Sequence, residues 1–353
     1  MKAYFVSSLV LVCSIGGWSL FNNVVDGASC TGNKGYLAST ANLNSEVGMY
    51  DDEGNVVPIK NKDLDIAEPK AVPLEQVAKG VIFYLYTRST VNNPDVLVVN
   101  DVERLKKSQF SISRPTKFII HGWLGSRQSR PLIGLRDALL QNGDFNVILV
   151  DWGLMARSPY RIASTCVVGV AKQVTSMIDF LETQGMDVSP LMLIGHSLGA
   201  HVVGLAARHA KTKPKFVIGL DPALPYFSIA NTENRIARGD GHYVLILHTN
   251  SGVLGFDLPL GDADFYFNGG TVQRGCEVDP TSACSHFRAT LFYAEALNSA
   301  NGFWGTKCDN YNNYRAGRCT EPKVLMGGIE PDTSITGVYY LDTTAVSPYA
   351  LGR

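Results

Sequence analysis

The stretch LMLIGHSLGAHVVGLAARHA, residues 191–210, decides the fold of this chain. Its first four residues form an apolar run typical of a buried strand, and residues 200–210 keep the spacing of a helix. Between them lies GHSLG, residues 195–199, a serine flanked by glycines at a strand-to-helix junction. Such a junction is typical of a nucleophile elbow, in which a sharp turn exposes the serine hydroxyl and glycines let strand and helix approach. We therefore predict that Ser197 is a nucleophile; the alternative is a helix that merely begins after a Gly/Ser turn.

Strands and helices alternate on both sides of this stretch. The runs KFII (117–120) and NVILV (146–150) are short and apolar, as strands buried on both faces should be. Residues 160–183 keep apolar positions three or four apart, which predicts a long helix capped by Gly185. The expected strands are 81–87, 117–120, 146–150, 191–194, 216–220 and 243–248, and the expected helices are 160–183, 200–210 and 286–297. This alternation predicts an α/β fold in one domain, with a mainly parallel sheet covered by helices on both faces.

Residues 1–20 are typical of a signal peptide, because Lys2 supplies a positive charge, residues 5–15 are mostly apolar and small residues follow. The alternative is a membrane anchor, but this run is too short to span a bilayer comfortably. No later stretch has eighteen uninterrupted apolar residues, so we expect a secreted, extracellular protein without a transmembrane segment. Residues 21–75 are polar and weakly patterned, which leaves open a pro-segment or a strap, and residues 76–353 are assigned to the folded domain.

The cysteine count indicates disulfides. Seven cysteines are present, and Cys13 leaves with the signal peptide, so six remain in a secreted chain. Six cysteines allow fifteen pairings. Short separations favour two pairs and leave the third by elimination: Cys276–Cys284, Cys308–Cys319 and Cys30–Cys166. No CxxC motif or Cys/His cluster has the spacing of a metal site.

The charge balance excludes one class of partner. The chain has 31 basic and 32 acidic residues, a formal net charge of −1, and no basic stripe. Because binding to phosphate backbones needs a basic excess, we expect no nucleic-acid partner.

A serine hydroxyl becomes a good nucleophile only when a base removes its proton, and an acid must orient that base. Asp221 follows the apolar run FVIGL and precedes Pro222, so it lies at the end of a strand, where the acid is expected. The alternative is an aspartate that only starts a turn before proline.

Three histidines follow Asp221, and one of them suits the base. His248 ends the run YVLILH and looks like a structural strand residue, and His242 lies in a turn. His286 follows Cys284 and opens a helix beside an expected disulfide, which would fix a catalytic loop. We therefore predict His286 as the base.

The oxyanion of an acyl-transfer intermediate needs two backbone N–H donors. One should be Leu198, which follows the nucleophile. The other should come from the loop after KFII, where Gly122 permits a tight turn and we assign the donor to Trp123. A role for Trp123 as a wall of the acyl pocket is compatible with the same position.

These residues resemble a known family, the pancreatic-lipase-like animal lipases and phospholipases A1. Seven blocks follow that family's order: HGW (121–123), VDWG (150–153), GHSLGAH (195–201), LDPALPYF (220–227), LHTN (247–250), DFYFNGG (264–270) and CSHFRA (284–289). The resemblance covers about residues 75–345 and implies the α/β-hydrolase fold. It maps the family's triad onto Ser197, Asp221 and His286, and its oxyanion donors onto Trp123 and Leu198.

Two departures from the family concern additional parts. The chain ends at Arg353, which leaves no room for the C-terminal β-sandwich of the digestive lipases, so we expect no colipase partner. Calcium-binding members place acidic ligands between the catalytic Asp and the strand ending in LHT. Here ENRIARGDGHY (233–243) keeps Glu233 and Asp240, but Ala237 stands where a carboxylate is expected. We therefore predict no metal and no cofactor.

A third departure concerns the lid, which family members hang between two cysteines before the catalytic histidine. Those cysteines correspond to Cys276 and Cys284, with only seven residues, EVDPTSA, between them. Such a loop rises about 10 Å at most, because seven residues extend to roughly 25 Å and a disulfide holds the ends together. It cannot carry a multi-turn amphipathic helix, and this resembles the phospholipase A1 members.

The sequence thus predicts a secreted serine esterase that cleaves carboxylic esters of lipids at a membrane, micelle or droplet surface. A phospholipase A1 acting at the sn-1 position is the first expectation, and a triacylglycerol lipase is the alternative. A third reading, from another class, is a non-enzymatic lipid-binding or yolk-storage protein on the same fold. The presence of the serine, acid, base and both oxyanion positions counts against it.

Overall fold

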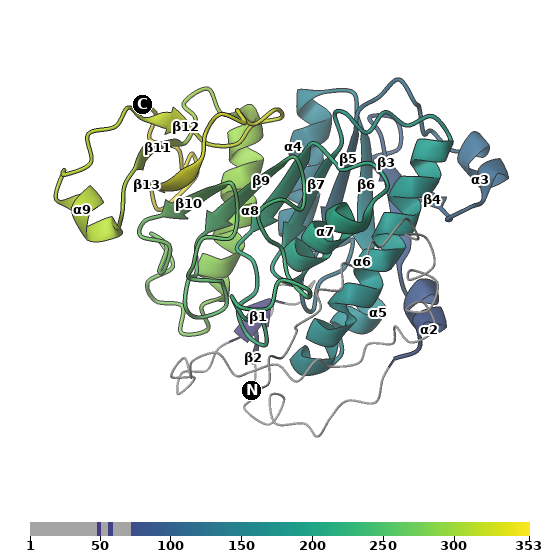
Figure 1. The fold of residues 1–353 in the computed structure, drawn as a ribbon, viewed down its shortest axis with the longest axis horizontal. Coiled ribbons are helices and arrows are strands. Elements are labelled where there is room, and N and C mark those ends of the chain that lie inside the picture. Colours follow the sequence, from purple (N-terminus) through teal and green to yellow (C-terminus); the bar gives the residue numbers. More distant parts are fainter. Residues whose placement is uncertain (1–47, 51–55, 59–71) are drawn as a thin grey trace, which may run out of the picture.

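The computed structural model describes residues 48–50, 56–58 and 72–353. Its centre is an eleven-stranded sheet with the order β12-β11-β13-β10-β9-β8-β7-β5-β6-β3-β4 (Figure 1). The strands are β3 (Ile82–Tyr86), β4 (Asp95–Leu97), β5 (Thr116–Ile120), β6 (Asn146–Asp151), β7 (Met192–His196), β8 (Phe216–Leu220), β9 (Tyr243–His248), β10 (Ala263–Phe267), β11 (Trp304–Lys307), β12 (Val324–Leu325) and β13 (Gly337–Leu341).

The middle of the sheet is parallel from β6 through β5, β7, β8, β9 and β10 to β13. Every residue of β5, β7, β8, β9 and β10 is buried, which explains why these segments are continuous apolar runs. Antiparallel strands close both edges, with β3 and β4 beside β6, and β11 and β12 beside β13. The carboxyl ends of the parallel strands therefore share one edge of the sheet, where ligands of open α/β sheets bind.

Helices cover both faces of this sheet. Those in the described part are α2 (Leu74–Lys79), α3 (Val102–Lys107), α4 (Arg130–Asn142), α5 (Gly153–Ala156), α6 (Tyr160–Thr183), α7 (Leu198–His209), α8 (Ala283–Asn298) and α9 (Tyr311–Arg315). The paired helices α6 and α7 pack over one face, and α4 and α8 pack together over the other (Figure 1). Each face has its own large apolar core. This arrangement confirms the predicted α/β-hydrolase fold.

A small antiparallel hairpin, β1 (Gly48–Tyr50) with β2 (Val56–Pro58), lies at the lower end of the strands in Figure 1. The N–H of Gly48 donates to the C=O of Thr281 at 3.0 Å, so β1 contacts the loop before α8. Met49 is buried and belongs to the core on the α6 and α7 side. Part of the predicted N-terminal extension is therefore packed against the domain.

The predicted elements agree closely where the periodicity was strong. The helix 160–183 and the strands 216–220 and 243–248 have the expected bounds. The expected helix 286–297 is present as α8, but it begins three residues earlier, at Ala283, so His286 lies in its first turn. The predicted helix 200–210 starts at Leu198 in the structure.

Two of the three predicted disulfides are formed in the structure. Cys276–Cys284 and Cys308–Cys319 are bonded, with Cα–Cα distances of 5.6 Å and 5.5 Å. The predicted partner of Cys166, Cys30, lies outside the described residues, as does the predicted signal peptide. Among the residues described, no helix combines the length and apolar character needed to cross a bilayer.

Candidate active site

Ser197 occupies the turn between β7 and α7. Its backbone has φ +58° and ψ −123°, a conformation that non-glycine residues rarely adopt. A Cβ at Gly195 would lie 2.1 Å from the carbonyl oxygen of Gly199, and a Cβ at Gly199 would lie 2.3 Å from that of Ile120. Strand and helix therefore approach so closely that only glycine fits at either position, as the elbow motif predicts.

Hydrogen bonds fix this elbow against the next strand. The N–H of Ser197 donates to the C=O of Leu220 at 3.0 Å, and its C=O accepts from the N–H of Ala223 at 3.3 Å. Both partners flank Asp221, which directly follows β8. The backbone of Ser197 is thus tied to both sides of the predicted acid.

Asp221 is fully buried, and its carboxylate is held on both oxygens. Oδ1 accepts from the backbone N–H groups of Thr249 at 2.8 Å and Asn250 at 3.0 Å. Oδ2 accepts from Nδ1 of His286 at 2.5 Å. A Cβ at Gly255 would lie 2.5 Å from either oxygen, so glycine is required where the loop covers the carboxylate. These contacts hold the carboxylate in one orientation, with Oδ2 toward His286.

His286 lies in the first turn of α8 with 1% of its side chain exposed. Its Nδ1 donates to Asp221, which fixes the tautomer and leaves Nε2 to accept a proton. The structure thereby brings together two predicted residues that are 65 positions apart. Because β7 and β8 are neighbours in the sheet, Ser197 and Asp221 follow adjacent strand ends.

The other two histidines beyond Asp221 take different roles. His248 is buried, with Nε2 on Asp264 at 2.8 Å and Nδ1 on the carbonyl oxygen of Phe256 at 2.9 Å. Both of its ring nitrogens are engaged, so neither is left for a serine hydroxyl. His242 lines a separate cavity with Lys213 and Lys215.

His196, which the sequence analysis did not single out, supports the base. Its Nε2 donates to the C=O of His286 at 3.1 Å, and the two ring centroids lie 4.5 Å apart. Burial and the neighbouring His286 hold the pKa of His196 well below its usual value. A neutral imidazole can therefore pack there without placing a second charge beside the base. Its position inside the GHSLG motif was the available signal.

The predicted oxyanion donors lie on the two segments that border the nucleophile. A Cβ at Gly122 would lie 2.6 Å from Cβ of Ser197, so the loop before Trp123 touches the elbow. Within the described part of the chain, the N–H groups of Trp123 and Leu198 have no hydrogen-bond acceptor. Two buried donors without partners are what an oxyanion site requires.

A second histidine missed from the sequence locks this loop. Nε2 of His121 accepts from the N–H of Trp152 at 3.0 Å, so Nδ1 carries the hydrogen and donates to the C=O of Gly122 at 2.9 Å. The indole of Trp152 donates to the C=O of His121 at 2.8 Å, and the two rings stack. The HGW and VDWG motifs therefore act together to position residues 121–123.

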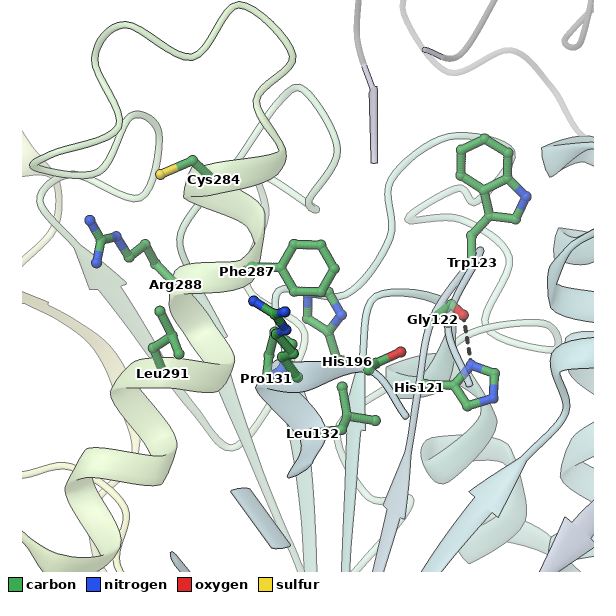
Figure 2. A pocket seen from close by; sticks show the side chains of 13 residues that line it. His121, Gly122, Trp123, Pro131, Leu132, His196, Cys284, Phe287, Arg288 and Leu291 are labelled. Atoms are coloured by element: carbon green, nitrogen blue, oxygen red, sulfur yellow. Dashed lines mark hydrogen bonds between the residues drawn. The ribbon is translucent and has the colours of Figure 1, made fainter. Parts of the chain in front are cut away.

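A pocket of about 360 Å³ opens beside the elbow (Figure 2). Its size falls in the range of small-molecule sites. Figure 2 shows Phe287, from α8, against His196, with Trp123 on the opposite side of the view and Leu132 below His196. The lining residues are His121, Gly122, Trp123, Gly125, Ser129, Arg130, Pro131, Leu132, His196, Cys284, Phe287, Arg288 and Leu291.

The loop between Cys276 and Cys284 is short and is held by internal hydrogen bonds as well as by its disulfide. Asp279 accepts from the N–H and hydroxyl of Thr281 and from the N–H of Cys284. Val278 at its tip is 93% exposed. The loop therefore contains no helix of its own that could cover the pocket.

An arginine from α7 contacts the segment 233–243, where calcium-binding relatives have acidic ligands. Arg208 pairs with Asp240 at 2.7 Å and also donates to the carbonyl oxygens of Thr232 and Arg235. Burial raises the pKa of Asp240, and the ion pair with Arg208 offsets this only in part. In the described residues, no group of three or more Asp, Glu, His or Cys could hold a metal. The absence of a metal remains a prediction.

The chain is similar to one protein family throughout the described domain. The family model described as Lipase matches residues 47–349. Pancreatic triacylglycerol lipase from Cavia porcellus is 32% identical over 274 residues, covering 71% of this chain and 58% of that protein. Phospholipase A1 member A from Bos taurus is 33% identical over 278 residues, covering 72% and 60%. Inactive pancreatic lipase-related protein 1 from Homo sapiens is 30% identical over 273 residues, covering 71% and 58%. The chain thus spans about 60% of the length of these relatives.

Proposed function

The chain belongs to the lipase family, and from this premise we propose that it hydrolyses carboxylic esters of lipids by acyl transfer. Ser197 attacks the ester carbonyl while His286 takes its proton, and Asp221 orients the imidazole. The N–H groups of Leu198 and Trp123 stabilise the oxyanion. His286 then protonates the leaving alcohol, and water releases the acyl group from the serine.

One observation carries this proposal. The hydrogen bond from Nδ1 of His286 to the buried Asp221 leaves Nε2 as a base at the sheet edge that bears Ser197. The backbone of Ser197 donates to Leu220 and accepts from Ala223, one on each side of Asp221, which strengthens the argument. The partnerless N–H groups of Trp123 and Leu198 add the donors that the reaction needs.

We infer that the substrate is a glycerophospholipid cut at the sn-1 ester. The closed loop between Cys276 and Cys284 supports this, because it leaves the pocket accessible to a polar head group. The similarity to a phospholipase A1 is consistent with it. The pocket would receive the glycerol end and part of an acyl chain between Leu132, Phe287 and Leu291.

Triacylglycerol is the second candidate substrate. Its support is the similarity to a pancreatic triacylglycerol lipase at nearly the same identity, 32% against 33%. The largely apolar walls of the pocket suit a neutral ester equally well.

We propose that the protein acts outside the cell, at the surface of a membrane, micelle or droplet. The two disulfides, Cys276–Cys284 and Cys308–Cys319, support an oxidising compartment.

The test compares initial rates on phosphatidylcholine and trioctanoin, with Ser197→Ala as the control. Cleavage of phosphatidylcholine at sn-1 with little action on trioctanoin supports phospholipase A1. Faster cleavage of trioctanoin than of phosphatidylcholine supports the proposed triad but overturns the assignment of a phospholipid substrate. Equal background from the wild type and Ser197→Ala on both substrates would favour a non-enzymatic lipid-binding or storage role.

A further inference from the structure

Arg130 is a charged residue of the pocket that takes no part in the proposed acyl transfer. Arg130 lines the cavity and is exposed to solvent. The other charged residue of the lining, Arg288, is buried and donates to Cys276 and to the carbonyl oxygens of Arg274 and Ala345. Arg288 therefore supports the walls, whereas Arg130 is available to a ligand.

The arginines nearest in sequence to Arg130 both contact other protein side chains. Arg127 lies over the ring of Tyr84 at 4.7 Å, and Arg136 pairs with Asp137 at 2.7 Å. Arg130, between them in sequence, has no hydrogen bond, ion pair or ring contact with any residue in the described ranges. A guanidinium lining a pocket without a protein partner is suited to an anionic ligand, because it offers planar paired donors.

The same cavity lies beside the nucleophile, because its lining includes residues that adjoin Ser197. His196, which directly precedes Ser197, and Gly122, which packs on the serine side chain, are both part of the lining. A substrate group that binds beside Arg130 would therefore lie in the same pocket region as the ester that Ser197 attacks. In a glycerophospholipid, a phosphodiester is joined to the sn-1 ester through the three carbons of glycerol. A neutral glyceride has no anion at this position.

We propose that Arg130 binds the phosphodiester of the substrate and determines the preference for phospholipids over neutral glycerides. This rests on the proposed function, since it names the part of the substrate that the pocket recognises. Arg130 begins α4, and the positive end of that helix adds to the attraction for an anion. Loss of one charge-assisted pair is expected to reduce kcat/KM on a phospholipid by about tenfold.

The experiment uses monomeric substrates, because without a lipid surface any effect on surface binding is removed. Dihexanoylphosphatidylcholine and dihexanoylglycerol are compared below their aggregation limits. The variants are Arg130→Gln, Arg130→Lys and the matched control Arg136→Gln, which removes a charge from the same helix outside the pocket. Taking the ratio of the two substrates within one variant cancels any loss of folded protein.

The expected result is a tenfold or larger fall on the phospholipid for Arg130→Gln, with the neutral ester changed less than twofold. Arg130→Lys should fall between it and the wild type, and Arg136→Gln should keep the wild-type ratio. Equal losses on both substrates, or an unchanged ratio, would overturn the inference while leaving the proposed function intact. Inhibition of neutral-ester hydrolysis by inorganic phosphate, relieved in Arg130→Gln, would assign the site to phosphate anions in general; its absence assigns it to phosphate within a lipid.

A wild type that cleaves neither ester would defeat the proposed function, and binding would then decide the inference. Calorimetric titration of dihexanoylphosphatidylcholine into Ser197→Ala and into Ser197→Ala/Arg130→Gln gives that readout. A weaker affinity in the double variant supports the role of Arg130, and equal affinities overturn it.

Discussion

Gly122→Ala adds one methyl group against the serine that we propose as nucleophile. An ideal Cβ at this position lies 2.6 Å from Cβ of Ser197 and 3.0 Å from its Oγ and from the carbonyl oxygen of His196. Carbon atoms in contact are normally about 3.5–4 Å apart. The loop and the elbow must therefore separate by about 1 Å, because hydrogen bonds to Leu220 and Ala223 hold the backbone of Ser197.

This displacement sets the expected magnitude. A shift of about 1 Å in catalytic geometry can reduce the rate about 100-fold, which corresponds to about 2.7 kcal/mol of activation free energy. The extra methyl group should also lower the free energy of unfolding by about 1–3 kcal/mol. We expect kcat/KM on a soluble p-nitrophenyl ester to fall about 100-fold in a protein that still folds.

Gly134→Ala is the matched control. A Cβ at Gly134, inside α4, meets no atom within 4 Å. Alanine in a helix interior should stabilise the fold by roughly 0.5–1 kcal/mol and leave the rate unchanged. Thermal melts followed by circular dichroism measure the stability of both variants. Wild-type kcat/KM in Gly122→Ala would refute the reasoning, since the methyl group could then be accommodated without disturbing the reaction.

Three other substitutions test the charges around the site and the core. Asp221→Asn should lower esterase kcat about 1,000- to 10,000-fold, because the amide cannot hold His286 in the required tautomer, and a loss below tenfold would contradict this. Arg208→Met should lower the free energy of unfolding by about 3 kcal/mol at pH 7, because it leaves the buried charge of Asp240 unpaired. The loss should be smaller at pH 4, because burial raises the pKa of Asp240 and protonation removes that charge. An equal loss of stability at both pH values would contradict this prediction. Lys117→Met should raise the free energy of unfolding at pH 7 and raise it by less at pH 9.5. Burial lowers the pKa of Lys117 to about 8, so the wild type loses the cost of a buried charge and becomes more stable as the pH rises past that value. An equal increase at both pH values would contradict the lowered pKa of Lys117.

Local patterns predicted the elements that have either a regular helical period or a continuous apolar run. The helix Tyr160–Thr183 faces the core along one stripe, and the strand Phe216–Leu220 is buried throughout, so both had clear signals. The start of α8 was less clear, because the small residues before His286 show no helical period. Strands that pair with segments far away in the sequence were harder to predict than this helix start. Ala263–Phe267 and Gly337–Leu341 were not predicted as strands, since their pairing joins segments more than seventy residues apart.

For Ser197 and Asp221, the sequence predicted a position directly after a strand, and the structure has both there. Asp221 directly follows β8, as predicted, whereas its hydrogen bond with His286 depends on how α8 packs beside the sheet, which local sequence does not show. The supporting roles of His121 and His196 could not be derived, because each acts on the backbone of a partner through tertiary contact. The same holds for Arg208, whose partners come from a separate loop.

The central claim is that Ser197 is an activated nucleophile, and labelling with a p-nitrophenyl alkylphosphonate tests it most directly. The reagent reacts with an activated serine, and peptide mass spectrometry locates the adduct. We predict one adduct per chain at Ser197, none in Ser197→Ala, and much slower labelling in Asp221→Asn. A folded wild-type protein that forms no adduct, or forms it at another residue, would contradict the account.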